Sequence, residues 1–355
     1  MRLVRAVVAS MGPFDRVSVP FADEHGQPRS LTVVHGGSGT GKTSLFQAIA
    51  TTRPGHAVAQ MARHHAPSAV VPSAACEWLL GMDDPARPHP LYVASPNVRW
   101  LPEEEAEGLR RREQGYYDRV AQEGGFALLA LSGARWFARQ PLVLSAPART
   151  VARYDVRAPL ATDDAARAEL SRETKQALAY AALSAALHTR GDNEEPRFDL
   201  LGQAMHEVVD RVAALAGLRY RGIEPHSFEP VFTEIGASLA GAPTWLFDTL
   251  PTRARHLVAL AALSVRTLWA AYPERDPRES EGVILVDDVE LHQDEHVLRE
   301  LPGVLVEVLP RAQWILLTSS AVLAASVSVD DVVALRRAER NASVAVFFGA
   351  AALTH

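Results

Sequence analysis

Runs of apolar residues along the chain predict a set of short strands. The segments 31–34 (LTVV) and 283–286 (VILV) are continuous apolar or β-branched stretches, typical of strands buried on both faces of a parallel sheet. Other runs are bounded by turn residues such as Gly12-Pro13. The strands that this pattern predicts are 2–9, 15–21, 31–34, 76–80, 91–94, 126–131, 244–247, 283–286 and 314–318.

Helical patterns lie between these strands. The segment 199–216 has apolar residues three or four positions apart, which predicts one stripe facing the core. They are Leu201, Met205, Val208, Val212 and Leu215. The segment 163–190 ends before Gly191, a typical helix C-cap. The predicted helices are 43–51, 102–122, 163–190, 199–216, 253–271 and 294–309, the last with an interruption at Pro302-Gly303.

Composition narrows the class of protein. The chain has 355 residues, 48% of them hydrophobic, and a net charge of −6, so it can bury a large core and has no overall basic field that attracts nucleic acid or membrane. Its single cysteine, Cys76, excludes an internal disulfide and a thiolate zinc site. It has no 18-residue apolar stretch and no signal-peptide core, so we expect a soluble cytoplasmic protein. Only Lys42 and Lys175 are lysines among its 36 basic residues.

The segment GGSGTGKT, which ends at Thr43, fits the phosphate-binding pattern G-x-x-x-x-G-K-[ST] between a predicted strand and a predicted helix. In such a loop, backbone N–H groups and the helix N-terminus surround phosphates. Lys42 would contact the β- and γ-phosphates, and the Thr43 hydroxyl would bind Mg²⁺. The alternative is a glycine-rich turn before an ordinary helix. The predicted nucleotide-binding residues are Gly36, Gly37, Ser38, Gly39, Thr40, Gly41, Lys42, Thr43 and Ser44.

A carboxylate pair, Asp287 and Asp288, follows the apolar run 283–286, as in a Walker B strand. Asp287 would hold Mg²⁺ through water, and Asp288 would orient or deprotonate the attacking water. The next buried strand begins at Trp314, 27 residues after Asp287, which leaves room for the crossover helix that a parallel sheet requires.

These motifs, in this order, resemble the ABC-type ATPase heads of the RecF, SMC and overcoming-lysogenization-defect group and their stand-alone bacterial AAA-like relatives. The matching segments are MGPF, GGSGTGKTSLFQAI, LVDDVELHQDE and RAQWILLTSS; Glu290 begins the E-L-H part of the family pattern DEPELHLHP. The resemblance is clear over about 1–50 and 280–325. It implies an α/β P-loop NTPase with an ABC-type head, in which a mostly parallel core sheet carries N-terminal antiparallel strands and an inserted helical lobe.

A change of composition around 145–165, together with this resemblance, predicts two lobes. Residues 1–150 with 281–355 would form the nucleotide-binding lobe with Walker A and Walker B. Residues 151–280 would form the helical lobe with a degenerate signature-like region. The chain has no sustained heptads, which excludes a long coiled-coil arm.

In the family, ATP lies between the P-loop of one head and the signature motif of another, usually Leu-Ser-x-Gly. The corresponding segment here, 247–253 (FDTLPTR), lacks that serine and that glycine. Thr252 would cap the following helix. Arg253 or Arg255 would supply charge as an arginine finger does; equally, these arginines would only cover a helix surface.

Two other positions depart from the family pattern, and a third is a weaker match. Asp288 is one methylene shorter than the usual glutamate, and Ser319 replaces the usual switch histidine. We therefore expect slow turnover, with ATP binding acting as a conformational clamp. Gln140 is the candidate for the Q-loop glutamine after the strand 126–131; the alternative is a surface glutamine before a proline.

Two clusters of chemically active side chains have simpler interpretations. The histidines at 64, 65 and 292 match no H-E-x-x-H or Cys/His pattern, so we expect them to be structural. The run Arg110-Arg111-Arg112 is typical of a solvated helix face more than of a phosphate or partner site.

Three functions fit these observations. The favoured one is a slow ATPase with Mg²⁺ as cofactor, whose ATP-dependent homodimer controls a protein partner in DNA repair or phage defence. The second is a RecF-like repair ATPase that binds duplex DNA directly, which the net charge disfavours. The third is a degenerate head that binds nucleotide without hydrolysis and acts as a scaffold.

Overall fold

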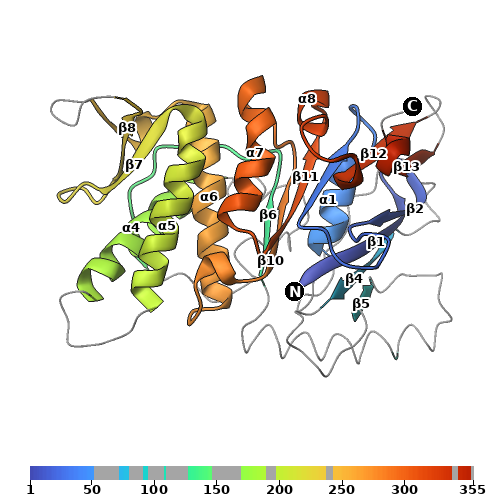
Figure 1. Cartoon of the computed structure of the whole chain (residues 1–355), viewed down its shortest axis with the longest axis horizontal. Coiled ribbons are helices and arrows are strands. Elements are labelled where there is room, and N and C mark those ends of the chain that lie inside the picture. Colours follow the sequence, from blue (N-terminus) through green and yellow to red (C-terminus); the bar gives the residue numbers. More distant parts are fainter. Residues whose placement is uncertain are drawn as a thin grey trace.

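The computed structural model describes residues 1–51, 72–79, 91–94, 108, 127–145, 169–188, 197–236, 243–337 and 343–352. Three sheets and the helices packed on them make up this part of the chain (Figure 1). No helix in these ranges is both long enough and apolar enough to cross a membrane.

The central sheet has six strands in the order β13-β12-β3-β11-β10-β6, all parallel except the edge strand β13. Most residues of β3, β10 and β11 are buried, as a sheet covered on both faces requires. The sequence patterns did not predict β12 and β13. The bounds are β3 Leu31–His35, β6 Leu128–Leu131, β10 Gly282–Val286, β11 Ala312–Thr318, β12 Val332–Arg337 and β13 Val344–Phe348.

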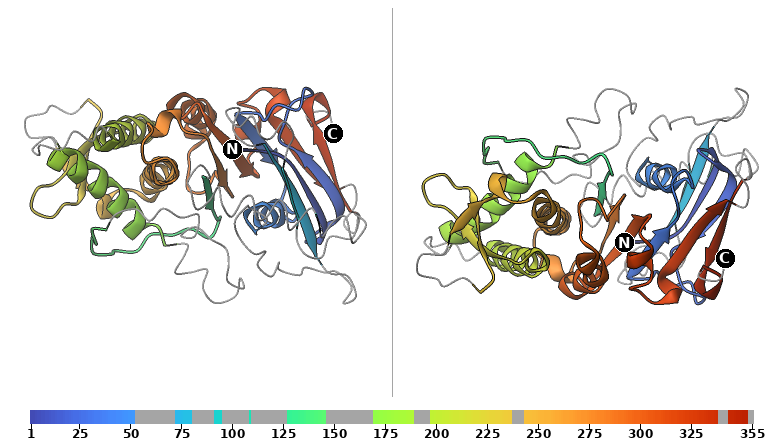
Figure 2. Two further views of the ribbon diagram at one scale, coloured as in Figure 1. Left: turned by 90° about the horizontal axis from the view of Figure 1, so that it is seen from below. Right: turned by 90° about the horizontal axis from the view of Figure 1, so that it is seen from above.

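A second, antiparallel sheet covers one side of the molecule, in the strand order β2-β1-β4-β5. Helix α1 (Lys42–Thr51) lies between this sheet and the central sheet (Figure 2), and its Leu45 and Ile49 belong to the core that the two sheets share. These strands confirm the predicted N-terminal antiparallel arrangement. They are β1 Arg2–Met11, β2 Phe14–Pro20, β4 Ser73–Leu79 and β5 Leu91–Ala94.

The helical part contains α4 (Ser171–His188), α5 (Arg197–Ala213) and α6 (Thr252–Ala271). The predicted stripe of α5 is buried, with Leu215 partly buried against it. A third, antiparallel sheet that the sequence patterns largely missed packs beside these helices (Figure 1). It consists of β7 Leu218–Ile223, β8 Pro230–Glu234 and β9 Thr244–Leu246, of which only β9 was predicted.

Helix α7 (Glu295–Val308) connects β10 to β11 and is continuous, so the predicted interruption at Pro302-Gly303 is wrong. A proline inside a helix removes one N–H donor, but α7 buries Val297, Leu301 and Leu305 against the sheet, and this burial outweighs the loss. Short helical segments complete the described chain. They are η2 Ala214–Ala216, η3 Phe247–Thr249, η4 Pro277–Glu279, α8 Ala321–Ala324, η5 Val329–Asp331 and η6 Gly349–Ala352.

One hydrophobic cluster includes Val33 of β3, Val208 of α5 and Leu257 of α6, so the central sheet and the helical part share a core. The two-lobe division with boundaries at 150 and 280 stays a prediction. The predicted helix 102–122, apart from Gly108, and the side chains of Arg110, Arg111, Arg112, His64 and His65 lie outside the described residues.

Candidate functional site

The predicted phosphate-binding loop joins β3 to α1. The Gly36 N–H donates to the Thr318 carbonyl at 3.1 Å, which fixes the start of the loop to the end of β11. Lys42 is buried, and its Nζ donates to the carbonyls of Gly36 at 2.7 Å and Gly37 at 3.1 Å. Residues 37–39 are exposed, so the outer part of the loop is open to solvent, whereas the ammonium group of Lys42 lies inside the loop.

Gly41 is required by geometry as well as by pattern. Its φ is +95°, and a Cβ there would lie 2.5 Å from Cζ of Phe14. A side chain at this position would therefore strain the backbone and collide with the turn between β1 and β2.

The end of the phosphate-binding loop and the end of the predicted Walker B strand lie next to each other. The Thr43 side chain lies close enough to the Asp287 carboxylate to favour its charged form. Asp287 follows the last residue of β10, and its N–H donates to the Leu131 carbonyl at 2.9 Å. Its side chain is 1% exposed, and burial raises the pKa of Asp287 to about 6.

These residues fit Mg²⁺. Asp287 Oδ1 is a buried oxygen with no hydrogen-bond partner among the described residues, and the carboxylate to which it belongs lies near the Thr43 side chain. Mg²⁺ prefers oxygen ligands and usually takes one or two from protein side chains. The described ranges contain no group of three His, Cys, Asp or Glu side chains placed to hold a metal ion. The His292 ring packs on the His256 ring, with centroids 5.2 Å apart.

The loop after β6 lies against the carboxylate of Asp288. Asp288 has a φ of +45°, a conformation that aspartate tolerates better than most residues. A Cβ at Gly133 would lie 2.5 Å from Asp288 Oδ2, so the glycine allows the carboxylate to rest on the loop backbone.

Arg135, which sequence reasoning missed, fixes this turn. It is buried, and its guanidinium donates to the carbonyl of Asp287 at 2.5 Å and that of Asp288 at 2.7 Å. Burial lowers the pKa of Arg135 to about 10, so it remains protonated at neutral pH. Its Nε donates to Nδ1 of His256 at 3.1 Å, and burial, with Arg135 nearby, lowers the pKa of this histidine to about 3. One side chain thus connects the Asp287-Asp288 turn to α6.

We expect Arg135→Met to reduce the free energy of unfolding by about 1–3 kcal/mol, because two carbonyls in a largely buried turn lose their donor. Chemical denaturation measures this effect. Arg139→Met, at an exposed position of the same loop, is the matched control. Equal stability of the two variants would contradict the assigned role of Arg135.

At the predicted switch position, Glu290 and Ser319 bond to each other. The Glu290 carboxylate accepts from the Ser319 N–H at 2.7 Å, the Ser319 hydroxyl at 2.6 Å and the Thr318 hydroxyl at 2.7 Å. Burial alone would raise the pKa of Glu290, but these hydrogen bonds lower it. Burial lowers the pKa of the neighbouring His35 ring, also missed from sequence, and the Ser319 backbone opposes this shift.

The signature-like segment differs in detail from expectation. The N-cap of α6 is Pro251, and no side chain caps the helix, so the predicted cap by Thr252 is wrong. Thr252 is already the first helical residue, and its hydroxyl accepts from Arg255 at 3.2 Å. Arg253 pairs with Asp294, and the Arg255 guanidinium lies 5.3 Å from the Phe137 ring centroid. A role for either arginine at a nucleotide stays a prediction.

Gln140 lies in the loop after β6, as predicted, but its carbonyl accepts a hydrogen bond from Lys175 of α4. Arg135, five residues earlier, makes the contact with the Asp287-Asp288 turn. A Q-loop role for Gln140 therefore stays a prediction.

No family model and no curated protein matches this chain. Among solved structures, an SMC head bound to the C-terminal winged-helix domain of ScpA aligns with 98% of this chain and 98% of its own, at 13% identity and a TM-score of 0.50. The SMC head domain from Thermotoga maritima (98% and 99% covered) and that from Pyrococcus furiosus with an extended coiled coil (98% and 96%) align at 13% identity, with TM-scores of 0.45 and 0.49. With the sheet order above, the first likeness shows a P-loop fold of the ABC type.

Proposed function

We propose that the protein binds ATP with Mg²⁺ at this site, hydrolyses it slowly, and uses ATP-dependent pairing of two copies to control a protein partner. The observation that carries the proposal is the contact between Thr43 and Asp287, with the buried Asp287 Oδ1 left unpartnered. This is the arrangement that a P-loop and a Walker B strand need in order to act on one nucleotide.

Each residue of the site has its own role in ATP binding and hydrolysis. The loop 36–41 and the N-terminus of α1 surround the phosphates, and Lys42 places its charge on the β- and γ-phosphates. Thr43 and Asp287 would hold Mg²⁺, which would supply positive charge to neutralise the charge that develops on the phosphate oxygens. Asp288 orients the attacking water and accepts its proton.

Slow turnover is the expected result of a steady-state ATPase assay. The carboxylate of Asp288 is short for this role and rests on the Gly133 backbone, and the switch position holds Ser319 bonded to Glu290. We expect turnover well below about 10 s⁻¹, the median for enzymes, and a further loss of roughly 10²–10⁴-fold in Asp288→Asn. Faster turnover would contradict the clamp mechanism, and ATP retained intact by the wild type would favour a non-hydrolysing scaffold.

Pairing is tested by analytical ultracentrifugation with and without ATP and Mg²⁺. The SMC head in the similar structure is bound to a winged-helix domain, and a protein partner for the present chain is proposed by analogy with that fold. A titration against duplex DNA at several salt concentrations tests the alternative of direct DNA binding, since phosphate contacts make affinity fall steeply with salt.

A further inference from the structure

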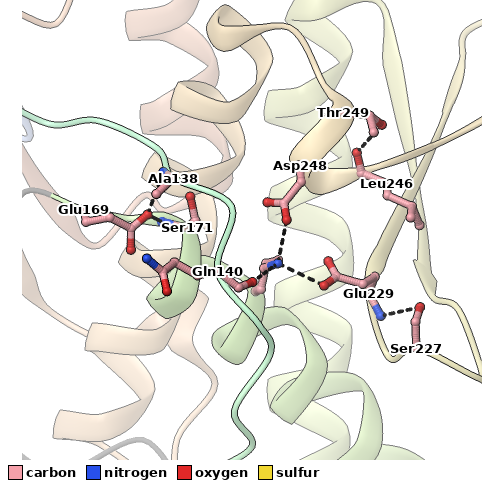
Figure 3. A network of polar contacts seen from close by, with 10 residues as sticks. Ala138, Gln140, Glu169, Ser171, Ser227, Glu229, Leu246, Asp248 and Thr249 are labelled. Atoms are coloured by element: carbon pink, nitrogen blue, oxygen red, sulfur yellow. Dashed lines mark hydrogen bonds and ion pairs between the residues drawn. The ribbon is translucent and has the colours of Figure 1, made fainter.

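The second lysine of the chain is a buried junction between four segments. Lys175, in α4, is 0% exposed. Its Nζ donates to the Gln140 carbonyl, to Glu229 Oε1 at 2.9 Å and to Asp248 Oδ2 at 2.9 Å. In Figure 3, Gln140, Glu229 and Asp248 converge from the loop after β6, the residue before β8 and η3, respectively.

The geometry of this junction explains why it holds a lysine. An ammonium group has three N–H donors that point in different directions, and all three have an acceptor here. An arginine would instead present its donors in one rigid planar fork. In a chain whose 36 basic residues include only two lysines, the other one lies in the phosphate-binding loop.

Several contacts hold the loop after β6 along residues 135–140. At one end, Arg135 holds the carbonyls of Asp287 and Asp288. Further along, the Ala138 N–H donates to Glu169 Oε1 at 3.1 Å, next to α4. Lys175 then holds the Gln140 carbonyl. The position of this loop therefore depends on both the Asp287-Asp288 turn and α4.

Asp248 brings the signature-like segment into the same network. It belongs to η3, which directly precedes α6, and its carboxylate is 21% exposed. Its bond to Lys175 is the contact by which the junction reaches the segment 247–253. Glu229, with a carboxylate 18% exposed, ties the same ammonium to β8 instead.

We propose that Lys175 is a positioning residue, whose bond to Asp248 fixes the segment 247–253 relative to the loop after β6. It thereby sets how tightly a second copy of the chain closes on bound nucleotide. This inference rests on the proposed function, and the occupant of the surface at 247–253 is a second copy that carries MgATP in its own loop.

The two carboxylates allow a matched test in the intact chain. Asp248→Ala removes the tie to the signature-like segment, and Glu229→Ala removes the tie to β8. Each variant leaves Lys175 with one carboxylate and the Gln140 carbonyl, so both variants change the net charge of the junction equally, from −1 to 0, and the ammonium stays paired. Three quantities are measured: affinity for a fluorescent ATP analogue, association in Mg²⁺ and a non-hydrolysable ATP analogue, and amide hydrogen exchange of 132–140 and 247–253.

Both variants are expected to bind the fluorescent analogue as the wild type does. Asp248→Ala is expected to associate about tenfold or more weakly, as the loss of a hydrogen bond to a charged group predicts, with faster exchange at 247–253. Glu229→Ala is expected to associate normally, and Asp248→Asn, which keeps an oxygen acceptor, to recover part of the association. Equal association of Asp248→Ala and Glu229→Ala would overturn the inference.

A failure of the proposed pairing would give a different experimental result. If the wild type shows no nucleotide-dependent association, pairing is refuted, and the positioning role is judged by exchange alone. Faster exchange at 247–253 in Asp248→Ala than in Glu229→Ala would then support the tie, and equal exchange would refute it.

Discussion

Lys42→Ala is expected to lose ATP binding by about 100-fold or more. The ammonium is buried and already directed into the loop by the carbonyls of Gly36 and Gly37, so it is preorganised for phosphate charge. Removing one partner of a buried charge pair costs roughly 2–5 kcal/mol, which corresponds to this loss. Titration with a fluorescent ATP analogue in the presence of Mg²⁺ measures it.

Ser38→Ala is the matched control for Lys42→Ala, because it changes an exposed residue of the same loop and keeps the backbone N–H groups. It is expected to bind within a few-fold of the wild type. Unfolding curves of both variants establish that the loop variant is folded. A folded Lys42→Ala protein with unchanged affinity would show that ATP does not bind at this loop.

Asp287→Asn is expected to stabilise the metal-free protein while it removes hydrolysis. The pKa of Asp287 rises from 3.8 to about 6 because its carboxylate is buried, so the folded protein binds this proton more tightly than the unfolded chain. The group therefore favours folding most below pH 3.8, and this contribution is lost as the pH rises through 6. The difference amounts to about 3 kcal/mol above that pH.

The measurement is chemical denaturation of both proteins in EDTA at pH 5 and pH 8. Asp287→Asn should exceed the wild type in unfolding free energy by about 3 kcal/mol at pH 8 and by less at pH 5. Asparagine keeps an oxygen for the Thr43 hydroxyl, so the change isolates the charge. A variant that is less stable than the wild type at pH 8, or equally stable at both values, would contradict this origin of the raised pKa.

The phosphate loop and the acidic strand end could be predicted from sequence because their chemistry is local. Gly41 needs a positive φ, and Lys42 and Thr43 follow it directly, so one short segment carries the whole signal. Asp287 ends a run of buried residues, which is visible in the same way. The parallel alignment of β10 and β11 then follows from the length of chain between them.

The contacts that hold the site together could not be predicted in this way. Arg135 reaches backbone carbonyls 152 and 153 residues further along the chain, and no spacing of residue types encodes a bond to a main-chain oxygen. Pro302 shows the opposite failure, because a local rule predicted a break that core packing overrides. The cap predicted at Thr252 was wrong because residue type fixes the start of a helix only to within one or two residues. A threonine cap would place the first helical residue at 253, but α6 begins at Thr252 itself.

The strand that begins the phosphate loop has consequences for synthesis on the ribosome. β3 pairs with β11 and β12, and Trp314 is the partner of Leu31, so both neighbours of this strand are translated close to 300 residues after it. At usual elongation rates, the nascent strand waits on the order of tens of seconds with both edges unpaired. During that interval a growing chain of this protein depends on chaperones, or on the N-terminal sheet and α1, to shield an apolar segment that later supports the phosphates.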